Sequence, residues 1–330
     1  MSSKIPTTAQ RGTLVASIKS FLDAHHIRLG GAEEFTTERA HHLEVFGIHT
    51  IPSEKRHPIA SAEFTAIRGP HGTIPIRVLY PSSDEVARKK GEAAALVYFH
   101  GGDTQSAALT SSRTGCACSP RFLGPKCTPS STASRRSTSS PSSWTNTPPS
   151  STRYSGGDSA GGNMTAAVTL RRRDSGMKNL AAQMLLYPEA RLPFDTPAAA
   201  EHNSGLYLEC NGIFSFADHY LPRGTAPGFK YISPGMQSVE YLAKQPPVAV
   251  FTSGFDPLRD VGVEYAHKLD EAGVEVHWRH YENLTHGWLQ MTAWSDEAIE
   301  AVKDVAKGLK KLLYEQWFSQ IQAEGGDSEL

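Results

Sequence analysis

The stretch GGDSAGGN, residues 156–163, contains the pattern Gly-x-Ser-x-Gly, in which Ser159 lies between Gly157 and Gly161. Small neighbours are needed where a strand turns sharply into a helix, because the backbone at the serine is strained and crowded. Such a turn pushes the serine Oγ out above the end of the strand, and the first N–H groups of the helix point to the same place. Alone, the pattern could equally be a glycine-rich turn with an incidental serine, so the rest of the sequence must decide.

Two motifs nearer the carboxyl end supply the partners that a nucleophilic serine needs. FTSGFDPLRD, residues 251–260, places Asp256 just after a predicted strand, and ENLTHGW, residues 282–288, places His286 in the loop after the next one. The order serine, aspartate, histidine is the chain order of serine hydrolases on this type of sheet. Asp256 would orient the imidazole of His286, which takes the proton from Ser159 and later returns it to the leaving group. Singly, a turn carboxylate and a loop histidine are the simpler interpretations, but together these residues predict a catalytic triad.

A glycine-rich strand end upstream of the serine completes the candidate site. YFHGGD, residues 98–103, ends a predicted strand with Gly101 and Gly102. Glycines there let backbone N–H groups come close to the oxyanion of a tetrahedral intermediate, and the N–H of Ala160 would join them. We therefore expect an oxyanion hole at Gly101, Gly102 and Ala160.

Taken together, the motifs GDSAGGN, LLYP, GFDPLRD and THGW form a specific signature. On these residues the chain resembles the hormone-sensitive-lipase-like family of α/β hydrolases, in its GDSAG-type branch, from about Ile59 to Phe318. The resemblance implies a lipase-like serine carboxylesterase that hydrolyses short-chain carboxylic esters through an acyl-serine intermediate on Ser159. It implies no cofactor and no metal. An amidase or peptidase, which the same triad serves, and a catalytically impaired or non-catalytic ligand-binding relative stay open as alternatives.

The fold that the resemblance implies is the α/β-hydrolase fold, with a mostly parallel central sheet, helices on both faces and a helical cap. Residues 56–330 would form the catalytic domain. Residues 1–55, with helices predicted at 8–26 and 32–46, would contribute to the cap. The insertion at about 195–243 would supply the rest of the cap, over the carboxyl ends of the strands, where open α/β sheets bind ligands.

Hydrophobic periodicity predicts the elements of this sheet. Short β-branched runs broken by Gly and Pro indicate strands, and apolar residues at helical spacing indicate helices. After Ser159 the two alternate, which is typical of a parallel sheet covered on both faces. The predicted strands are 64–69, 74–81, 93–100, 181–188, 246–257 and 274–282, and the predicted helices of the catalytic domain are 159–174, 262–273 and 296–318.

The segment between the HGG motif and the serine departs from the family. Asp103 stands where the family has the third glycine of His-Gly-Gly-Gly, and from Thr104 to Gly157 there is no Asp, Glu, Val or Ile. Ser, Thr, Pro and Arg dominate, and such a composition buries too little apolar surface to offset chain entropy. We expect the family's strand and two helices to be missing or disordered in 103–156. We also expect 154–156 to be too short and glycine-rich for a strand that leads into the serine.

A shifted reading frame is our hypothesis for this aberrant segment. Residues 132–137, Thr-Ala-Ser-Arg-Arg-Ser, can be encoded so that a one-base slip spells Tyr-Arg-Leu-Ala-Pro-Glu, which ends the family's missing strand. The same slip through 126–131 permits Gln-Val-Tyr-Ala-Val-Glu, and restoring one base near Gly102 allows a third glycine. A strand lost from the middle of a sheet exposes unpaired edges. We therefore expect the chain as written to fold poorly and to lack a cooperative unfolding transition.

The composition bears on partners and location. With 33 Lys and Arg against 34 Asp and Glu, the chain has no electrostatic footprint for nucleic acid or an anionic membrane. No run approaches the ~20 apolar residues that span a bilayer, and the first residues lack the apolar core of a signal peptide. Cys116, Cys118 and Cys127 lie in the aberrant segment and Cys210 lies elsewhere, so neither a disulfide framework nor a zinc site is expected. We expect a cytoplasmic protein that acts on a small-molecule ester, with a homodimer as an open possibility.

Overall fold

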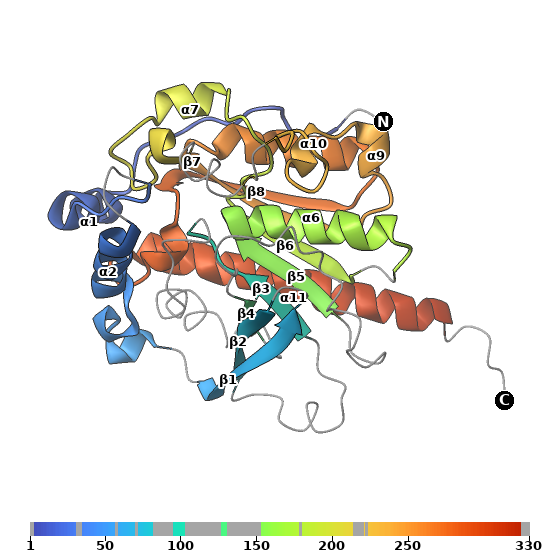
Figure 1. The fold of residues 1–330 in the computed structure, drawn as a ribbon, viewed down its shortest axis with the longest axis horizontal. Coiled ribbons are helices and arrows are strands. Elements are labelled where there is room, and N and C mark those ends of the chain that lie inside the picture. The colour runs from blue at the N-terminus through green and yellow to red at the C-terminus, as the bar shows by residue number, and fades with distance from the viewer. Residues whose placement is uncertain are drawn as a thin grey trace.

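The computed structural model describes residues 3–30, 35–56, 59–69, 72–81, 95–102, 127–130, 153–177, 180–213, 221 and 224–324. Within these residues, strands and helices follow one another in the alternation that the sequence predicts, and the strands form one sheet (Figure 1). The strands are β1 (Ile59–Gly69), β2 (Gly72–Pro81), β3 (Ala95–Phe99), β4 (Cys127–Ser130), β5 (Arg153–Asp158), β6 (Ala182–Leu186), β7 (Val248–Phe255) and β8 (Val276–Thr285).

The order of the strands in the sheet is β1-β2-β4-β3-β5-β6-β7-β8. β1 pairs antiparallel with β2, and β2 pairs antiparallel with β4. From β4 to β8 every neighbouring pair is parallel. This is the α/β-hydrolase fold that the sequence predicted. Because parallel strands end at the same edge of a sheet, whatever follows β5, β7 and β8 in the chain is brought together there.

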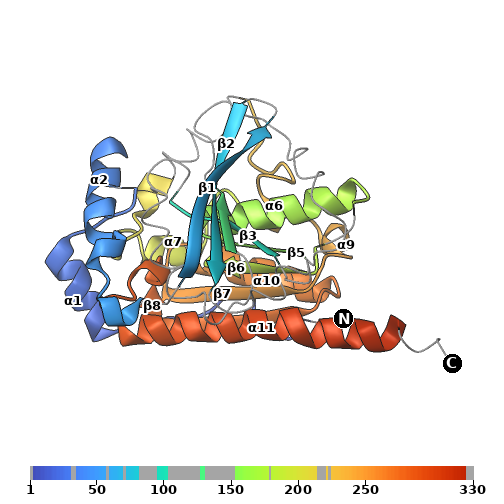
Figure 2. The same cartoon turned by 90° about the horizontal axis from the view of Figure 1, so that it is seen from below.

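Helices cover both faces of the sheet, and the side chains of the strands alternate between them. In β7, Val248 and Val250 pack in the core shared with α6 and α10, whereas Ala249 and Phe251 pack in the core that contains α11. Figures 1 and 2 show α11 running along the side of the sheet opposite α6. The α-helices are α1 (Ala16–His25), α2 (Phe35–Phe46), α6 (Ala160–Asp174), α7 (Pro197–Glu201), α9 (Val239–Leu242), α10 (Arg259–Glu271) and α11 (Asp296–Glu324). The 3-10 helices are η1 (Ile48–Thr50), η2 (Ser53–Lys55), η4 (Pro234–Met236) and η5 (Trp288–Gln290).

The first predicted helix is shorter than its apolar spacing suggested. It begins at Ala16, and residues before it run extended along the end of β8. There Gly12 N–H donates to Glu282 C=O at 2.9 Å, and Val15 N–H donates to Asn283 C=O at 3.1 Å. Tertiary pairing with β8 therefore overrides the helical pattern of this stretch.

Two expectations about the aberrant segment are corrected by the sheet. A strand is present between β2 and β3, because β4 occupies that place at Cys127–Ser130. Residues 153–158 also form a strand, β5, which pairs with β3 and β6. Backbone hydrogen bonds to a neighbour on each side need no particular side chains, so composition alone gave no signal for either strand. Asp103 and the two expected helices lie outside the described residues.

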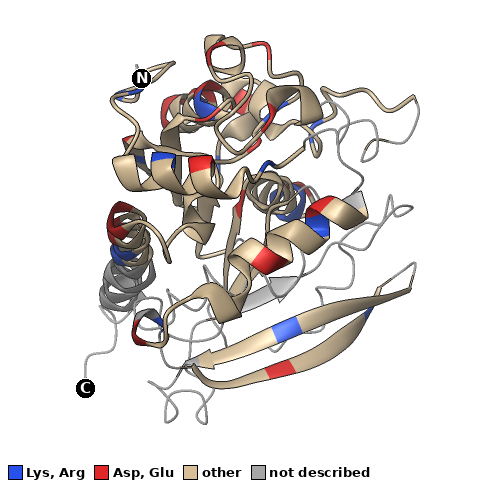
Figure 3. Cartoon of the chain, turned by 90° about the vertical axis from the view of Figure 1, so that its left-hand side faces the viewer, with Lys and Arg blue, Asp and Glu red and all other residues tan. Residues whose placement is uncertain are grey.

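Positively and negatively charged residues lie side by side on the same helices. On the side of the molecule drawn in Figure 3, Lys and Arg lie among Asp and Glu along the helices. This mixture matches the net charge of −1. In the part of the chain that the structure describes, none of the helices is both long enough and apolar enough to cross a membrane.

Candidate active site

Ser159 occupies a strained turn between β5 and α6. Its φ of 55° and ψ of −124° lie in a region that side chains rarely adopt, and the residue is buried. The glycines on either side are required by close backbone approach. A Cβ on Gly157 would come within 2.3 Å of the Gly161 carbonyl oxygen, and one on Gly161 within 2.0 Å of the Phe99 carbonyl oxygen. The Gly-x-Ser-x-Gly pattern is thus explained by packing of the turn against β3.

The structure brings the three predicted catalytic residues together at the carboxyl edge of the sheet. Ser159 Oγ lies 3.0 Å from His286 Nε2, and His286 Nδ1 lies 2.9 Å from Asp256 Oδ2. The aspartate and histidine side chains are each 1 % exposed. A carboxylate at Nδ1 places the proton on that nitrogen and leaves Nε2 free to accept the serine proton.

A bulge at the end of β7 aims the aspartate. The register between β7 and β8 shifts between Ser253 and Phe255, and a Cβ on Gly254 would lie 2.0 Å from the Glu282 carbonyl oxygen. Bulges re-aim the residues that follow them. The other oxygen of Asp256, Oδ1, accepts the Leu258 N–H at 2.8 Å at the start of α10. Both carboxylate oxygens are therefore satisfied.

An aromatic ring packs against the histidine. The Tyr187 ring meets the His286 imidazole edge-on with centroids 4.7 Å apart, and Trp288 packs edge-on against the same tyrosine at 5.8 Å. Gly287, at φ 72°, leaves room for Tyr207, whose Cε1 would lie 2.5 Å from a Cβ there. Because the His286 side chain is 1 % exposed, its two hydrogen bonds are shielded from solvent.

The Gly101 amide, one of the three groups predicted for the oxyanion hole, already has an acceptor in this structure. Gly101 N–H donates to Asp158 Oδ1 at 2.9 Å, and Tyr98 O–H donates to the same oxygen at 2.7 Å. A Cβ on Gly101 would also lie 3.0 Å from Ser159 Cβ. Gly101 is therefore needed for close approach to the serine. Gly102 follows with φ 87°, and Ala160 is the first residue of α6.

The sequence reasoning missed the side chains that hold this site in place. Asp158 is the variable residue of Gly-x-Ser-x-Gly, and an acid beside a nucleophile was a signal that could have been used. Tyr187 belongs to the LLYP motif, but its contact with His286 forms only in the tertiary structure and has no local sequence pattern. Among the described residues, no three His, Cys, Asp or Glu side chains are grouped so that they could hold a metal ion.

The fold and this geometry define a class of protein. A strained serine between a strand and a helix lies within hydrogen-bond reach of a histidine that an aspartate supports, at the carboxyl edge of a mostly parallel sheet. These are the features of serine hydrolases with the α/β-hydrolase fold.

Comparisons with known proteins agree with this class. Residues 144–290 match a family model described as alpha/beta hydrolase fold. Esterase LipI of Mycobacterium tuberculosis is 27 % identical over 294 residues, which cover 81 % of this chain and 87 % of the relative. Carboxylesterase NlhH of the same organism is 31 % identical over 162 residues, and the match spans 48 % of this chain and half (50 %) of the relative's length. The solved structure of a hyperthermophilic esterase from the archaeon Pyrobaculum calidifontis superposes with a TM-score of 0.75 at 23 % identity, over 92 % of this chain and 99 % of that one.

Over residues 144–290 the chain is thus similar to α/β hydrolases, and the curated relatives that it resembles are carboxylic ester hydrolases.

Proposed function

We propose that the protein hydrolyses short-chain carboxylic esters through an acyl-serine intermediate on Ser159. The observation that carries this proposal is the pair of hydrogen bonds from His286, 3.0 Å to Ser159 Oγ and 2.9 Å to Asp256 Oδ2. The names of the relatives, esterase and carboxylesterase, support an ester as substrate.

The reaction has two halves, acylation and deacylation, and in each half His286 accepts one proton and gives it back. His286 Nε2 takes the Ser159 proton as Oγ attacks the ester carbonyl, and Asp256 stabilises the imidazolium that forms. The same Nε2 proton then goes to the alkoxy oxygen as the ester C–O bond breaks and the alcohol leaves. Water, deprotonated by His286, attacks the acyl-serine, and the serine recovers its proton as the carboxylic acid is released.

The oxyanion of the tetrahedral intermediate would be bound by the N–H groups of Gly102 and Ala160. Ala160 is the first residue of α6, where N–H groups have no partner within the helix and carry the positive end of its dipole. Gly102 is the next residue after Gly101, where an added Cβ would lie 3.0 Å from Ser159 Cβ.

The cap would be formed by residues 1–55 together with the insertion at 195–243, over a catalytic domain of residues 56–330. Its two parts are joined where Leu29 N–H donates to Tyr207 C=O at 2.7 Å and Glu209 N–H donates to Leu29 C=O at 2.9 Å. Tyr207 then reaches the glycine beside the catalytic histidine. An acyl group bound above Ser159 would therefore meet cap side chains.

Hydrolysis of p-nitrophenyl esters from acetate to palmitate tests the substrate class. We expect kcat/KM to be highest for acetate to hexanoate and to fall for longer chains. A maximum at palmitate would contradict the short-chain assignment, and hydrolysis of the matching p-nitroanilides at comparable rates would indicate an amidase. Cytoplasmic location and a homodimer stay predictions, for which cell fractionation and light scattering are the tests.

A further inference from the structure

The turn that presents Asp256 is bracketed by one arginine. Arg259 N–H donates to Asp256 C=O at 3.0 Å, and the Arg259 guanidinium Nη1 lies 3.3 Å from the Gly254 carbonyl oxygen. Gly254 is the residue at which the register of β7 and β8 shifts. A carbonyl displaced from the ladder by a bulge needs another donor, and the guanidinium provides it. Arg259 is thus bonded to the chain on both sides of the catalytic aspartate.

The guanidinium is buried and its charge is balanced locally. The Arg259 side chain is 5 % exposed, and Asp260, 1 % exposed, accepts from its Nε at 2.9 Å and from Nη2 at 3.4 Å. Asp260 Oδ2 also accepts the Ala198 N–H in α7 at 2.9 Å. Because Asp260 neutralises Arg259, the charge of Asp256 is left for His286.

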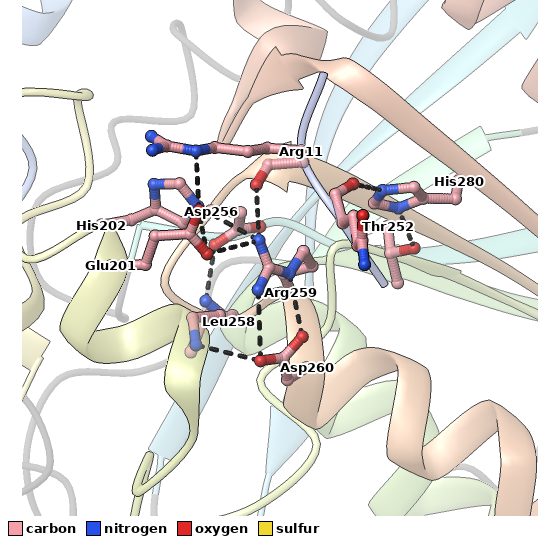
Figure 4. Close-up of polar contacts among 12 residues, drawn as sticks. Arg11, Glu201, His202, Thr252, Asp256, Leu258, Arg259, Asp260 and His280 are labelled. Atoms are coloured by element: carbon pink, nitrogen blue, oxygen red, sulfur yellow. Dashed lines mark hydrogen bonds and ion pairs between the residues drawn. The ribbon is translucent and has the colours of Figure 1, made fainter. Parts of the chain in front are cut away.

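The remaining contacts of the guanidinium are with the end of α7, where Glu201 in turn pairs with Arg11. Nη1 donates to Glu201 Oε2 at 2.9 Å and lies 3.3 Å from His202 Nε2. Burial lowers the pKa of His202, which favours the neutral ring that can accept this bond. The other carboxylate oxygen of Glu201 pairs with Arg11 Nε at 2.6 Å. Figure 4 shows Arg259 between Asp260 and the pair formed by Glu201 and His202, with Arg11 on the far side of Glu201.

We propose that Arg259 is a positioning residue for catalysis: its guanidinium fixes the bulged turn that holds Asp256 against His286, and Glu201 on α7 locks the guanidinium in that orientation. The inference rests on the proposed serine-esterase function. Arginine is suited to this role because its planar fork can bond several acceptors in fixed directions, whereas the lysine ammonium is a point charge on a flexible stem. A displacement of about 1 Å in catalytic geometry can cost about 100-fold in rate.

Steady-state kinetics of Arg259→Lys with p-nitrophenyl butyrate test the proposal. The variant keeps the charge beside Asp260 but loses the fork, so we expect kcat to fall about 10- to 100-fold with KM changed less than 3-fold. Arg279→Lys on β8 is the matched control, since its guanidinium pairs with Asp304 at an exposed position 3.4 Å away, and it should keep the parent kcat.

Glu201→Gln is a second variant that tests the proposal even if Arg259→Lys fails to fold. Its side chain is 30 % exposed and its removal leaves Arg259 paired with Asp260, so the variant should fold, with kcat about 3- to 10-fold lower and KM within 2-fold. If the parent hydrolyses the ester and both variants keep its kcat, the positioning role of Arg259 is overturned and the proposed esterase function is not. A parent protein that neither hydrolyses the ester nor reacts with a fluorophosphonate would overturn the proposed function, and the positioning role with it.

Discussion

The backbone of Ser159 is held in its strained conformation by hydrogen bonds on both sides. Its N–H donates to Leu186 C=O at 2.9 Å, and its C=O accepts from Asn163 N–H at 3.1 Å. The Asn163 side chain in turn donates to the Glu189 and Ile232 carbonyls at 2.7 and 2.8 Å. Strain of this kind costs on the order of 1–3 kcal/mol and persists only where the surroundings over-determine it. The bonds across β6 and α6 provide that constraint.

Asp256→Asn should lower kcat about 10⁴-fold with little loss of stability. The asparagine Oδ1 can still accept the Leu258 N–H, but its amide N–H₂ would face His286 Nδ1. The imidazole would then carry its proton on Nε2 and could not accept the serine proton. Ester hydrolysis and a thermal melt measure the two effects, with Asp304→Asn as the control. A kcat within tenfold of the parent would argue against Asp256 as the orienting residue.

Gly161→Ala should destabilise the fold, by about 3 kcal/mol or more, because overpacking against backbone cannot be relieved by side-chain rotation. The added Cβ would lie 2.0 Å from the Phe99 carbonyl oxygen. Gly308→Ala in α11 is the matched control, since its Cβ would meet its nearest atom, in Phe251, at 3.4 Å. That change should be neutral or stabilise by up to about 1 kcal/mol through helix propensity. Equal denaturant midpoints for the two variants would contradict the crowding argument.

At the residue scale, the triad could be predicted, whereas the contacts that support it could not. Ser159, Asp256 and His286 have motif context and chain order, both of which are properties of the sequence. The use of the Gly101 amide by Asp158 depends on where β3 ends beside β5. The bond between Arg259 and Glu201 joins elements 58 residues apart, and no local pattern marks it.

At the scale of elements, one carboxylate connects the end of α6 to the segment before β7. Asp174 accepts from Arg173 at 2.7 Å, Lys230 at 2.8 Å, Tyr231 at 2.9 Å and the Tyr241 hydroxyl. Burial alone would raise the pKa of Asp174, but these four donors outweigh it and hold the pKa well below its usual value. The ionised carboxylate therefore stabilises the packing of residues 230–241 on α6.

Asp174→Asn should lower the free energy of unfolding at pH 7 by about 2 kcal/mol. The pKa of Asp174 is lower in the folded chain than in the unfolded one, so its contribution is present above the unfolded pKa, near 4. It is lost as the pH falls toward the depressed folded value. Urea unfolding of parent and variant at pH 7 and at pH 3 should thus show a difference that shrinks in acid.

Asp195→Asn is the matched control for this prediction. Asp195 pairs with Arg191 at 2.6 Å but is 66 % exposed, so its removal should change stability by less than about 0.5 kcal/mol. A gap between parent and Asp174→Asn that stays constant down to pH 3 would show that the carboxylate charge is not what stabilises the contact.

Most helices and strands could be predicted because their apolar side chains recur at the spacing that burial in a helix or a strand requires. The alternation of Val248, Ala249, Val250 and Phe251 between two cores follows from β7 being covered on both faces. β4 and β5 lack such a pattern, because neither the Pro-Ser pair in β4 nor the Ser-Gly-Gly run in β5 alternates apolar with polar residues. Both strands are instead held by hydrogen bonds to the neighbouring strands. The start of α1 was placed too early because residues 12–15 bond to β8.

At the scale of the whole molecule, the continuity of the sheet changes the expectation for folding. Our reasoning from the sequence expected exposed edges between β2 and β3, but β4 pairs with both. A sheet without an internal edge has one core on each face, and a chain of this kind should unfold cooperatively. Thermal unfolding followed by far- and near-ultraviolet circular dichroism should give coincident transitions. Separate or gradual transitions would support the expectation from the sequence that the chain folds poorly.

The reading-frame hypothesis for residues 103–156 stays a prediction and has a direct test. β4 falls at Cys127–Ser130, within the stretch 126–131 where the slipped frame also spells an alternating strand. Sequencing of the transcript across codons 100 to 157 should reveal one additional base near codon 102 and a restored Tyr-Arg-Leu-Ala-Pro-Glu. A transcript that encodes the chain as written would refute the hypothesis.

The central claim is that Ser159 is a nucleophile activated by His286 and Asp256. The most direct measurement is intact-mass and peptide analysis of the folded protein after treatment with a fluorophosphonate, beside Ser159→Ala. We predict one covalent adduct on Ser159 in the parent and none in the variant, with ester hydrolysis lost in proportion to labelling. An unlabelled parent protein that unfolds cooperatively, or a label that persists in Ser159→Ala, would contradict the claim.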